Sequence, residues 1–470
     1  MTVISRNVRS NLVNAILAQG MSFALSIIIA LVVPKVLGVE AYSYWQLFVF
    51  YSSFSGLFLF GLNDGLYLVY GGEEREELDQ AEICMHFKVS ILVQIVIAAV
   101  ILSVSLFSSF NAERKIILFF LAIYILLFNA VGFWGSVLQA INETRLYSRA
   151  IIASKIFSIV CLIPLILCSV DSFIPYIVVS LAAQCVSFCY IIYTCREFLR
   201  FFGSKISFCR SCSFCKIGIK LTIANISSML IIGLARAVID TNWGIIEFGK
   251  ISLSLSVVNF LLMFLSQVGM VLFPALRSSK DINIAETYRK LSDICDICLP
   301  FAYLLYFPIS SLLLLWLPQY SESFVYLGVL LPICVFDGKM QMVIATYLKV
   351  LRMENKLLFV NLACMILSVV FSCIGAFCFN NLWIVLAGMV VSVMFRNILA
   401  SLFLARNFQQ NNFESVACQI LLGAAFMLGA IYIHGSLFPM LVIMAISTLL
   451  FMRRKIIKAS ISAILNKSTQ

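Results

Sequence analysis

The sequence predicts an all-α integral membrane protein with about fourteen transmembrane helices, in two pseudo-symmetric six-helix lobes followed by two C-terminal helices. Of the 470 residues, 62% are hydrophobic and only 12% are charged, and the mean hydropathy is +1.04. A soluble domain carries about a quarter charged residues. The apolar residues also gather in runs that are long enough to cross about 30 Å of hydrocarbon. A soluble fold could not cover this much apolar surface, so the composition indicates a chain solvated by lipid.

The apolar runs set the expected spans. They lie at 12–33, 46–70, 84–107, 116–140, 150–169, 175–196, 218–239, 251–273, 298–317, 324–348, 357–379, 383–405, 416–434 and 437–453. Because backbone polar groups in lipid must bond internally, we expect helices. The first run ends in Val33-Pro34-Lys35 without a small-residue cleavage site, which predicts a retained span rather than a signal peptide.

The distribution of Lys and Arg predicts the orientation. With the N-terminus inside, most basic loop residues fall on the cytoplasmic side, and the basic tail after residue 452 places the C-terminus there too. The two longest polar intervals, 197–217 and 275–297, are then both cytoplasmic. The second predicts a surface helix with Ile284, Tyr288, Leu291 and Cys295 on one face, although a simple spacer is an alternative.

A weak internal repeat predicts the division of the chain. At an offset of about 206 residues, Gly38 and Glu40 after the first span correspond to Gly244 and Glu247 after the seventh. Six spans per repeat is an even number, so the two halves are expected to point the same way through the membrane. We therefore expect an N-terminal lobe at 1–196, a basic cytoplasmic linker at 197–217, a C-terminal lobe at 218–405 and two added helices with a basic tail at 406–470.

Ionisable side chains inside spans are the candidates for a functional site. Each costs about 2.5–3.5 kcal/mol at the middle of a helix, so each needs a partner or a function. The candidates within or near the ends of spans are Asp64, Lys155, Arg236, Asp240, Asp337, Lys339 and Arg396.

These residues predict a water-filled cavity between the two lobes. Arg236, Lys339 and Arg396 would present positive charge to an anionic group such as a diphosphate. Asp64, Asp240 and Asp337 would pair with these cations in the empty cavity, or bind a proton or a sodium ion. The amides of Asn63 and Asn259 would contact the substrate as well. Static ion pairs between helices are the alternative interpretation.

The glycines at both ends of Gly61-Leu62-Asn63-Asp64-Gly65 predict a loosened helix whose backbone faces the same cavity. No Gly-rich phosphate loop and no extramembrane domain with catalytic residues is present, so we expect neither an enzyme nor a bound cofactor. Energy for transport would come from an ion gradient of H+ or Na+, from the membrane potential or from the substrate gradient. Cys209, Cys212 and Cys215 have a metal-like spacing but no nearby His, and we interpret them as reduced cytosolic thiols without an assigned role.

Several segments together resemble bacterial polysaccharide flippases, which move undecaprenyl-diphosphate-linked oligosaccharides. The segments are an Asn at the start of the first span, Pro34 to Gly38 with Tyr42 and Trp45, Gly61 to Gly65, Ile239-Asp240 with Gly244 and Phe248-Gly249, and Leu272 to Leu276. The resemblance implies the multidrug/oligosaccharidyl-lipid/polysaccharide exporter fold, alternating access and a cationic cavity for the diphosphate-linked glycan. Similar chains often carry Asp-Arg where this one has Asp240-Thr241, and Arg236, one turn earlier, is the candidate replacement.

The predicted function is therefore the flipping of an undecaprenyl-diphosphate-linked oligosaccharide, such as an O-antigen unit for lipopolysaccharide or another surface polysaccharide unit. The predicted location is the bacterial cytoplasmic membrane. Expected partners are membrane lipids, a polysaccharide polymerase and a chain-length regulator, and no nucleic acid. An ion-coupled drug or cation antiporter of the same superfamily, a membrane glycan polymerase and an assembly scaffold are the alternatives.

Overall fold

The computed structural model describes residues 2–201, 203, 205–278, 284–409, 413–433 and 437–452, and it leaves out the side chains of 2–12, 16, 264–278, 413, 451 and 452. The predicted basic tail therefore lies outside the described residues, as do two positions of the linker and Lys280. Helices account for nearly all of this described part, which contains no strand. The predicted all-α integral membrane class is confirmed.

The chain divides into two compact units, unit 1 from Met1 to Ile226 and unit 2 from Ser227 to Gln470. The division falls inside one long helical element, which belongs to unit 1 at its beginning and to unit 2 after that.

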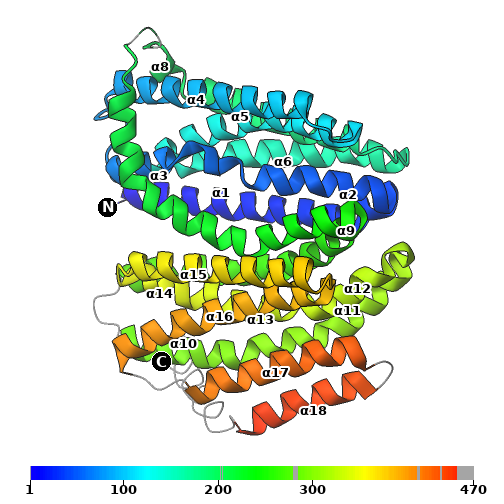
Figure 1. Cartoon of the computed structure of the whole chain (residues 1–470). Helices are drawn as coiled ribbons and strands as arrows, with labels where there is room; N and C mark the ends of the chain where they lie inside the picture. The colour runs from blue at the N-terminus through cyan, green and yellow to red at the C-terminus, as the bar shows by residue number, and fades with distance from the viewer. Residues whose placement is uncertain are drawn as a thin grey trace. The chain divides into compact units, whose positions relative to one another are not determined.

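Unit 1 contains the amphipathic and apolar helices of the N-terminal half. Its elements are α1 (Thr2–Ile27), η1 (Ile28–Val32), α2 (Val33–Ser53), η2 (Ser55–Leu59), α3 (Leu62–Val69), α4 (Gln80–Phe107), α5 (Ala112–Ala140), α6 (Thr144–Leu167), α7 (Phe173–Thr194), α8 (Arg196–Leu199) and the beginning of α9 (Phe208–Ser278). Helix α5 packs against α4 on one side and α6 on another, and the three run side by side in Figure 1.

Unit 2 continues from α9. Its elements are α10 (Ile284–Cys298), η3 (Leu299–Phe301), α11 (Ala302–Trp316), η4 (Pro318–Tyr320), α12 (Ser321–Leu330), α13 (Pro332–Lys339), η5 (Met340–Ile344), α14 (Ala345–Val350), α15 (Glu354–Cys373), η6 (Ile374–Cys378), α16 (Leu382–Phe408), α17 (Phe413–Tyr432) and α18 (Leu437–Met452). The helix predicted in the polar interval before residue 298 is present as α10, with Tyr288 and Cys295 buried. Its location at a membrane surface stays a prediction.

Ten helical elements within the described ranges are long and apolar enough to cross a membrane, or eleven if the bent pair Pro318–Leu330 and Pro332–Val350 is one span. Two of the ten, Val13–Leu59 and Phe208–Met263, are about twice the length that one crossing needs. Each contains a non-helical glycine, Gly38 or Gly244. With each of these divided in two and the shorter α18 included, the layout is consistent with fourteen spans.

The two non-helical glycines share one conformation. Gly38 has φ 70° and ψ 178°, and Gly244, 206 residues later, has φ 85° and ψ 179°. This region of backbone space is open almost only to glycine. The weak sequence repeat therefore corresponds to a repeated turn of the backbone.

The apolar core of unit 1 lies where α3, α4 and α5 meet the beginning of α9. Phe87 of α4, Phe133 and Trp134 of α5, Phe198 of α8 and Phe214 of α9 belong to one buried cluster. The rings of Phe87 and Trp134 lie 5.1 Å apart, and those of Trp134 and Phe198 lie 5.5 Å apart. This aromatic core holds α8 and the start of α9 against the helix bundle.

Candidate functional site

Two buried ion pairs meet on α13, immediately before the π-helix η5. Asp337 accepts a hydrogen bond from Nη1 of Arg396 on α16 at 2.9 Å, and Lys339 forms an ion pair with Asp296 on α10. Residues two positions apart on a helix point to different sides. Asp337 and Lys339 therefore connect α13 to two different helices.

Further polar side chains saturate both carboxylates. Asp296 also accepts hydrogen bonds from Ser415 and, at 2.6 Å, from Nε2 of Gln419, both on α17. Asp337 accepts from Nε2 of Gln341 at 2.6 Å. The side chains of Lys339 and Asp296 are each only 3% exposed. Such a buried pair persists only with this kind of additional hydrogen bonding.

Arg236 lies in the limb of α9 that precedes Gly244. Its Nη2 donates to the hydroxyl of Ser252 at 2.7 Å, and its guanidinium carbon lies 4.9 Å from the ring centre of Phe248. Because both contacts come from the limb after Gly244, the glycine turn folds α9 back onto itself. Asp240 is buried in the first limb, and Asn259 is exposed in the second.

Asp64 and the two glycines around it pack directly against α9 within unit 1. Thr222 of α9 donates a hydrogen bond to the Asp64 carboxylate. A Cβ added at Gly61 would lie 2.7 Å from the backbone nitrogen of Ile219, and one added at Gly65 or Gly218 would overlap the backbone of the other helix. Real Cβ atoms essentially never approach that closely. Gly61 and Gly65 therefore serve close helix packing, and Asn63 points to α5, where its amide nitrogen would be 3.3 Å from a Cβ at Gly132.

The structure brings together some of the predicted site residues. Asp337 and Arg396 are paired, as expected for an empty site, whereas Lys339 pairs with Asp296, which lies outside the predicted set. Hydropathy alone placed Asp296 in a polar interval, and its acidic side chain on the buried face of α10 was the signal that could have identified it. The substrate and ion contacts of Asn63, Asp64, Arg236, Asp240, Asn259, Asp337, Lys339 and Arg396 stay predictions.

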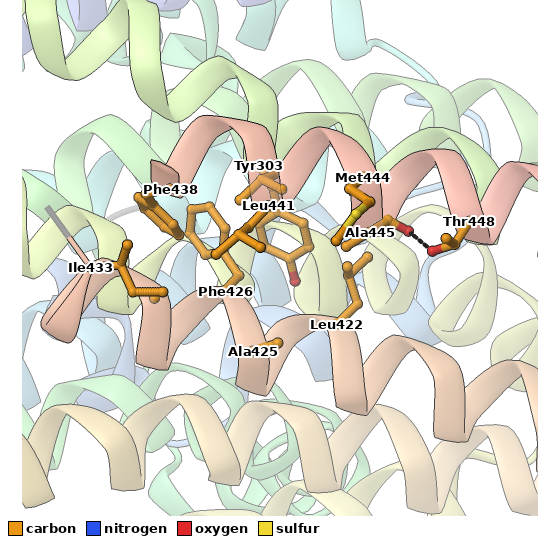
Figure 2. A pocket seen from close by; sticks show the side chains of 12 residues that line it. Tyr303, Leu422, Ala425, Phe426, Ile433, Phe438, Leu441, Met444, Ala445 and Thr448 are labelled. Carbon is orange, nitrogen blue, oxygen red and sulfur yellow. Dashed lines mark hydrogen bonds between the residues drawn. The ribbon is translucent and has the colours of Figure 1, made fainter. Parts of the chain in front are cut away.

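Unit 2 also contains an apolar groove, between α11, α17 and α18. Its volume is about 380 Å³, and its lining includes Tyr303, Ala425, Phe426, Phe438 and Leu441. Figure 2 shows the rings of Tyr303, Phe426 and Phe438 gathered at one end, with Met444 and Thr448 toward the other. The Thr448 hydroxyl donates to the Ala445 carbonyl at 2.7 Å, so the groove offers hydrocarbon contact almost exclusively.

The cysteines with metal-like spacing lie at the start of α9. Cys209 and Cys212 are exposed and Cys215 is half-buried. Over the described ranges, no three His, Cys, Asp or Glu side chains are placed to hold a metal ion.

No protein-family model matches the chain, and no curated protein sequence does either. Solved structures are similar in fold. Lipid II flippase MurJ in an inward closed conformation has a TM-score of 0.67 at 11% identity, and the match covers 95% of this chain and 99% of that chain. The inward-facing conformation of a multidrug resistance MATE family transporter of the MOP superfamily has a TM-score of 0.61 at 14% identity, covering 84% of this chain and 98% of that one. The chain thus has the fold of the MOP-superfamily membrane transporters.

Proposed function

We propose that the chain flips an undecaprenyl-diphosphate-linked oligosaccharide across the bacterial cytoplasmic membrane by alternating access. The oligosaccharide would be an O-antigen unit or another surface polysaccharide unit. Both termini would be cytoplasmic, and a glycan polymerase and a chain-length regulator would act on the product. The observation that carries this proposal is the apolar groove of unit 2.

The groove suits a hydrocarbon chain better than a drug-like cation. Its two long walls, α17 and α18, are apolar helices of membrane type, and its lining holds no charged residue. Burying a polyprenyl chain there gains about 0.8 kcal/mol for each methylene removed from water. A cationic drug would instead require an acidic partner, which the lining lacks.

The extent of the structural matches supports the same interpretation. The flippase match leaves out 5% of the 470 residues, about 24, which is fewer than the residues of α17 and α18 together. That likeness therefore extends into the C-terminal helices. The MATE match leaves out 16%, enough to omit both.

The buried cations would act on the diphosphate after their pairs open. Arg396 and Lys339 are neutralised by Asp337 and Asp296. A diphosphate could replace these carboxylates because guanidinium and ammonium groups bind phosphate oxygens through charge-assisted hydrogen bonds. In this proposal the two acids hold the cations in place between transport cycles, and an H+ or Na+ gradient supplies the energy.

Reconstitution tests the proposal. The purified chain is placed in proteoliposomes with an undecaprenyl-diphosphate-linked oligosaccharide that carries a fluorophore on the sugar, and dithionite quenches the fluorophore in the outer leaflet. A flippase exposes the inner pool, so quenching proceeds past about half of the signal; empty liposomes stop there. Quenching that stops at half, together with proton-driven uptake of ethidium, would instead support the drug antiporter.

In cells, deletion of the gene distinguishes the flippase from the polymerase. Complete lipid-linked units held on the cytoplasmic leaflet support flipping. Single units displayed outside without polymerisation contradict it.

A further inference from the structure

The second span of unit 1 is broken, and the break frees backbone carbonyls inside the membrane. Helix α2 ends at Ser53, the 3-10 helix η2 covers Ser55–Leu59, and α3 starts at Leu62. Between them Phe60 and Gly61 have left-handed φ values of 49° and 87°. Each freed carbonyl needs a donor, because hydrocarbon provides none.

Two amide side chains supply those donors. Nε2 of Gln94 on α4 donates to the carbonyl of Phe58 at 2.8 Å, and Nδ2 of Asn129 on α5 donates to the carbonyl of Ser55 at 3.0 Å. Nδ2 of Asn129 also donates to Oε1 of Gln94 at 2.7 Å. This chain of bonds determines which end of each amide is nitrogen. Oδ1 of Asn129 must therefore point away from Gln94 and from the Ser55 carbonyl.

Three oxygens around this network have no hydrogen-bond partner among the residues that the structure describes. They are Oδ1 of Asn129, the hydroxyl of Ser55 and the hydroxyl of Ser90, one turn before Gln94 on the same face of α4. Asn129 and Ser55 are fully buried and Ser90 is 3% exposed. Other helical serines of this unit, such as Ser43 and Ser52, donate to the carbonyl four residues earlier. Capping of the broken span explains the two amide nitrogens but not these oxygens.

The chemistry of the three oxygens favours a monovalent cation. A buried acceptor without a donor is costly unless a ligand satisfies it. All three are neutral, whereas calcium and magnesium sites in proteins are built around carboxylates. Nothing in the group titrates near neutral pH, so proton binding does not explain it. Unwound backbone with neutral oxygens is a known way for membrane proteins to hold Na+.

One face of α5 provides a route to this position. Asn129, Gly132, Ser136 and Gln139 follow one another at spacings of three or four residues, so they share a face of the helix. Asn129 is buried, Gly132 and Ser136 are half-buried and Gln139 is exposed. The amide of Asn63 lies beside Gly132. Polar or small residues thus extend from the three oxygens to the end of α5, and an ion could follow them.

We propose that Asn129, Ser55 and Ser90 bind a small monovalent cation, Na+, at the broken second span of unit 1. The site is separate from the ion pairs of unit 2, and it does not depend on the identity of the transported substrate. Occupancy would stabilise η2 against α4 and α5, and would therefore stiffen the break.

The test is sodium-dependent stability of the purified full chain in detergent, without any lipid-linked substrate. Thermal unfolding is followed in choline chloride and in NaCl at constant ionic strength, alongside binding of 22Na+. A ligand that binds only the folded state raises its stability, and we expect NaCl to raise the midpoint by about 3 °C. Ser55→Ala and Ser90→Ala should each require about tenfold more Na+ for the same rise.

Ser103→Ala is the matched control, because Ser103 is exposed on α4 and its hydroxyl donates to the Ala99 carbonyl. It should respond to Na+ as the wild type does. The midpoints in choline chloride report whether each variant folds. Equal wild-type midpoints in the two salts would overturn the proposal, as would a wild-type sodium response in both Ser55→Ala and Ser90→Ala. Failure of the flipping assay alone would leave this result unaffected.

Discussion

Lys339 and Asp296 form an ion pair in the interior of unit 2 and join the end of α13 to α10. Through the same carboxylate, Ser415 and Gln419 attach α17. The pair is thus a junction of three helices and includes one of the two C-terminal helices that the sequence predicts as an addition to the second lobe.

Replacing Lys339 by Ala should destabilise the protein. The change leaves Asp296 buried without its counter-charge, which typically costs about 3–5 kcal/mol. Thermal unfolding in detergent should show a clear fall in the midpoint. The double variant Lys339→Met, Asp296→Leu should recover much of this loss, because no charge then remains buried.

The control is Lys290→Ala, because Lys290 pairs with Glu286 where both side chains are more than half exposed. An exposed pair contributes little, so this midpoint should stay near that of the wild type. If Lys339→Ala unfolds like the wild type but does not flip substrate, the residue acts in substrate binding and the structural explanation is wrong.

Replacing Gly218 by Ala should separate α3 from α9. The added Cβ would overlap the backbone at Gly61 and Gly65, and backbone atoms cannot move aside as a flexible side chain can. We expect a large loss of folded protein, measured as the monodisperse fraction in size-exclusion chromatography. Gly20→Ala provides the comparison, since a Cβ there meets nothing within 4 Å, and it should behave as the wild type.

Gly38→Ala and Gly244→Ala should destabilise the protein by similar amounts. Neither added Cβ meets an atom within 4 Å, so the cost is backbone strain alone, about 1–3 kcal/mol at each position. The measurement is the midpoint of thermal unfolding for each single variant. A neutral effect at one glycine and a large effect at the other would show that the two turns are not equivalent.

Filling the groove of unit 2 should slow flipping. Ala425 is exposed and lines the groove, so Ala425→Trp would occupy space needed by a polyprenyl chain. We expect at least a severalfold lower rate in the dithionite assay, with unchanged stability. Leu428→Trp on the same helix is the control, because Leu428 is 52% exposed and outside the lining. Equal rates for both variants would remove the groove from the mechanism.

Hydropathy was sufficient for the fold class, since each apolar run of the required length became part of a helix. The repeat was also detectable, because a turn that only glycine can adopt leaves a glycine at the corresponding place in each half. The pairing of Asp337 with Arg396 was expected from the high cost of isolated charges in a span.

The remaining features depend on contacts between segments that are distant in sequence. Asp296 pairs with Lys339 across 43 residues, and Gly65 packs on Phe214 across almost 150. Gly61 and Gly65 predicted a loosened helix, but a glycine that relaxes a helix and one that admits a neighbouring backbone look the same in a sequence. Gln94 was absent from the candidate residues because its role arises only from the broken span beside it.

The packing of Gly218 against α3 also affects the order in which the protein forms during synthesis. By the sequence repeat, the second half begins near Phe208, yet the first 19 residues of α9 complete unit 1. A nascent chain that stops before Phe208 leaves the backbone at Gly61 and Gly65 uncovered, so the N-terminal half is no autonomous folding module. Its final packing must wait until the ribosome has begun the second half, which makes the duplication boundary a poor place to split the gene.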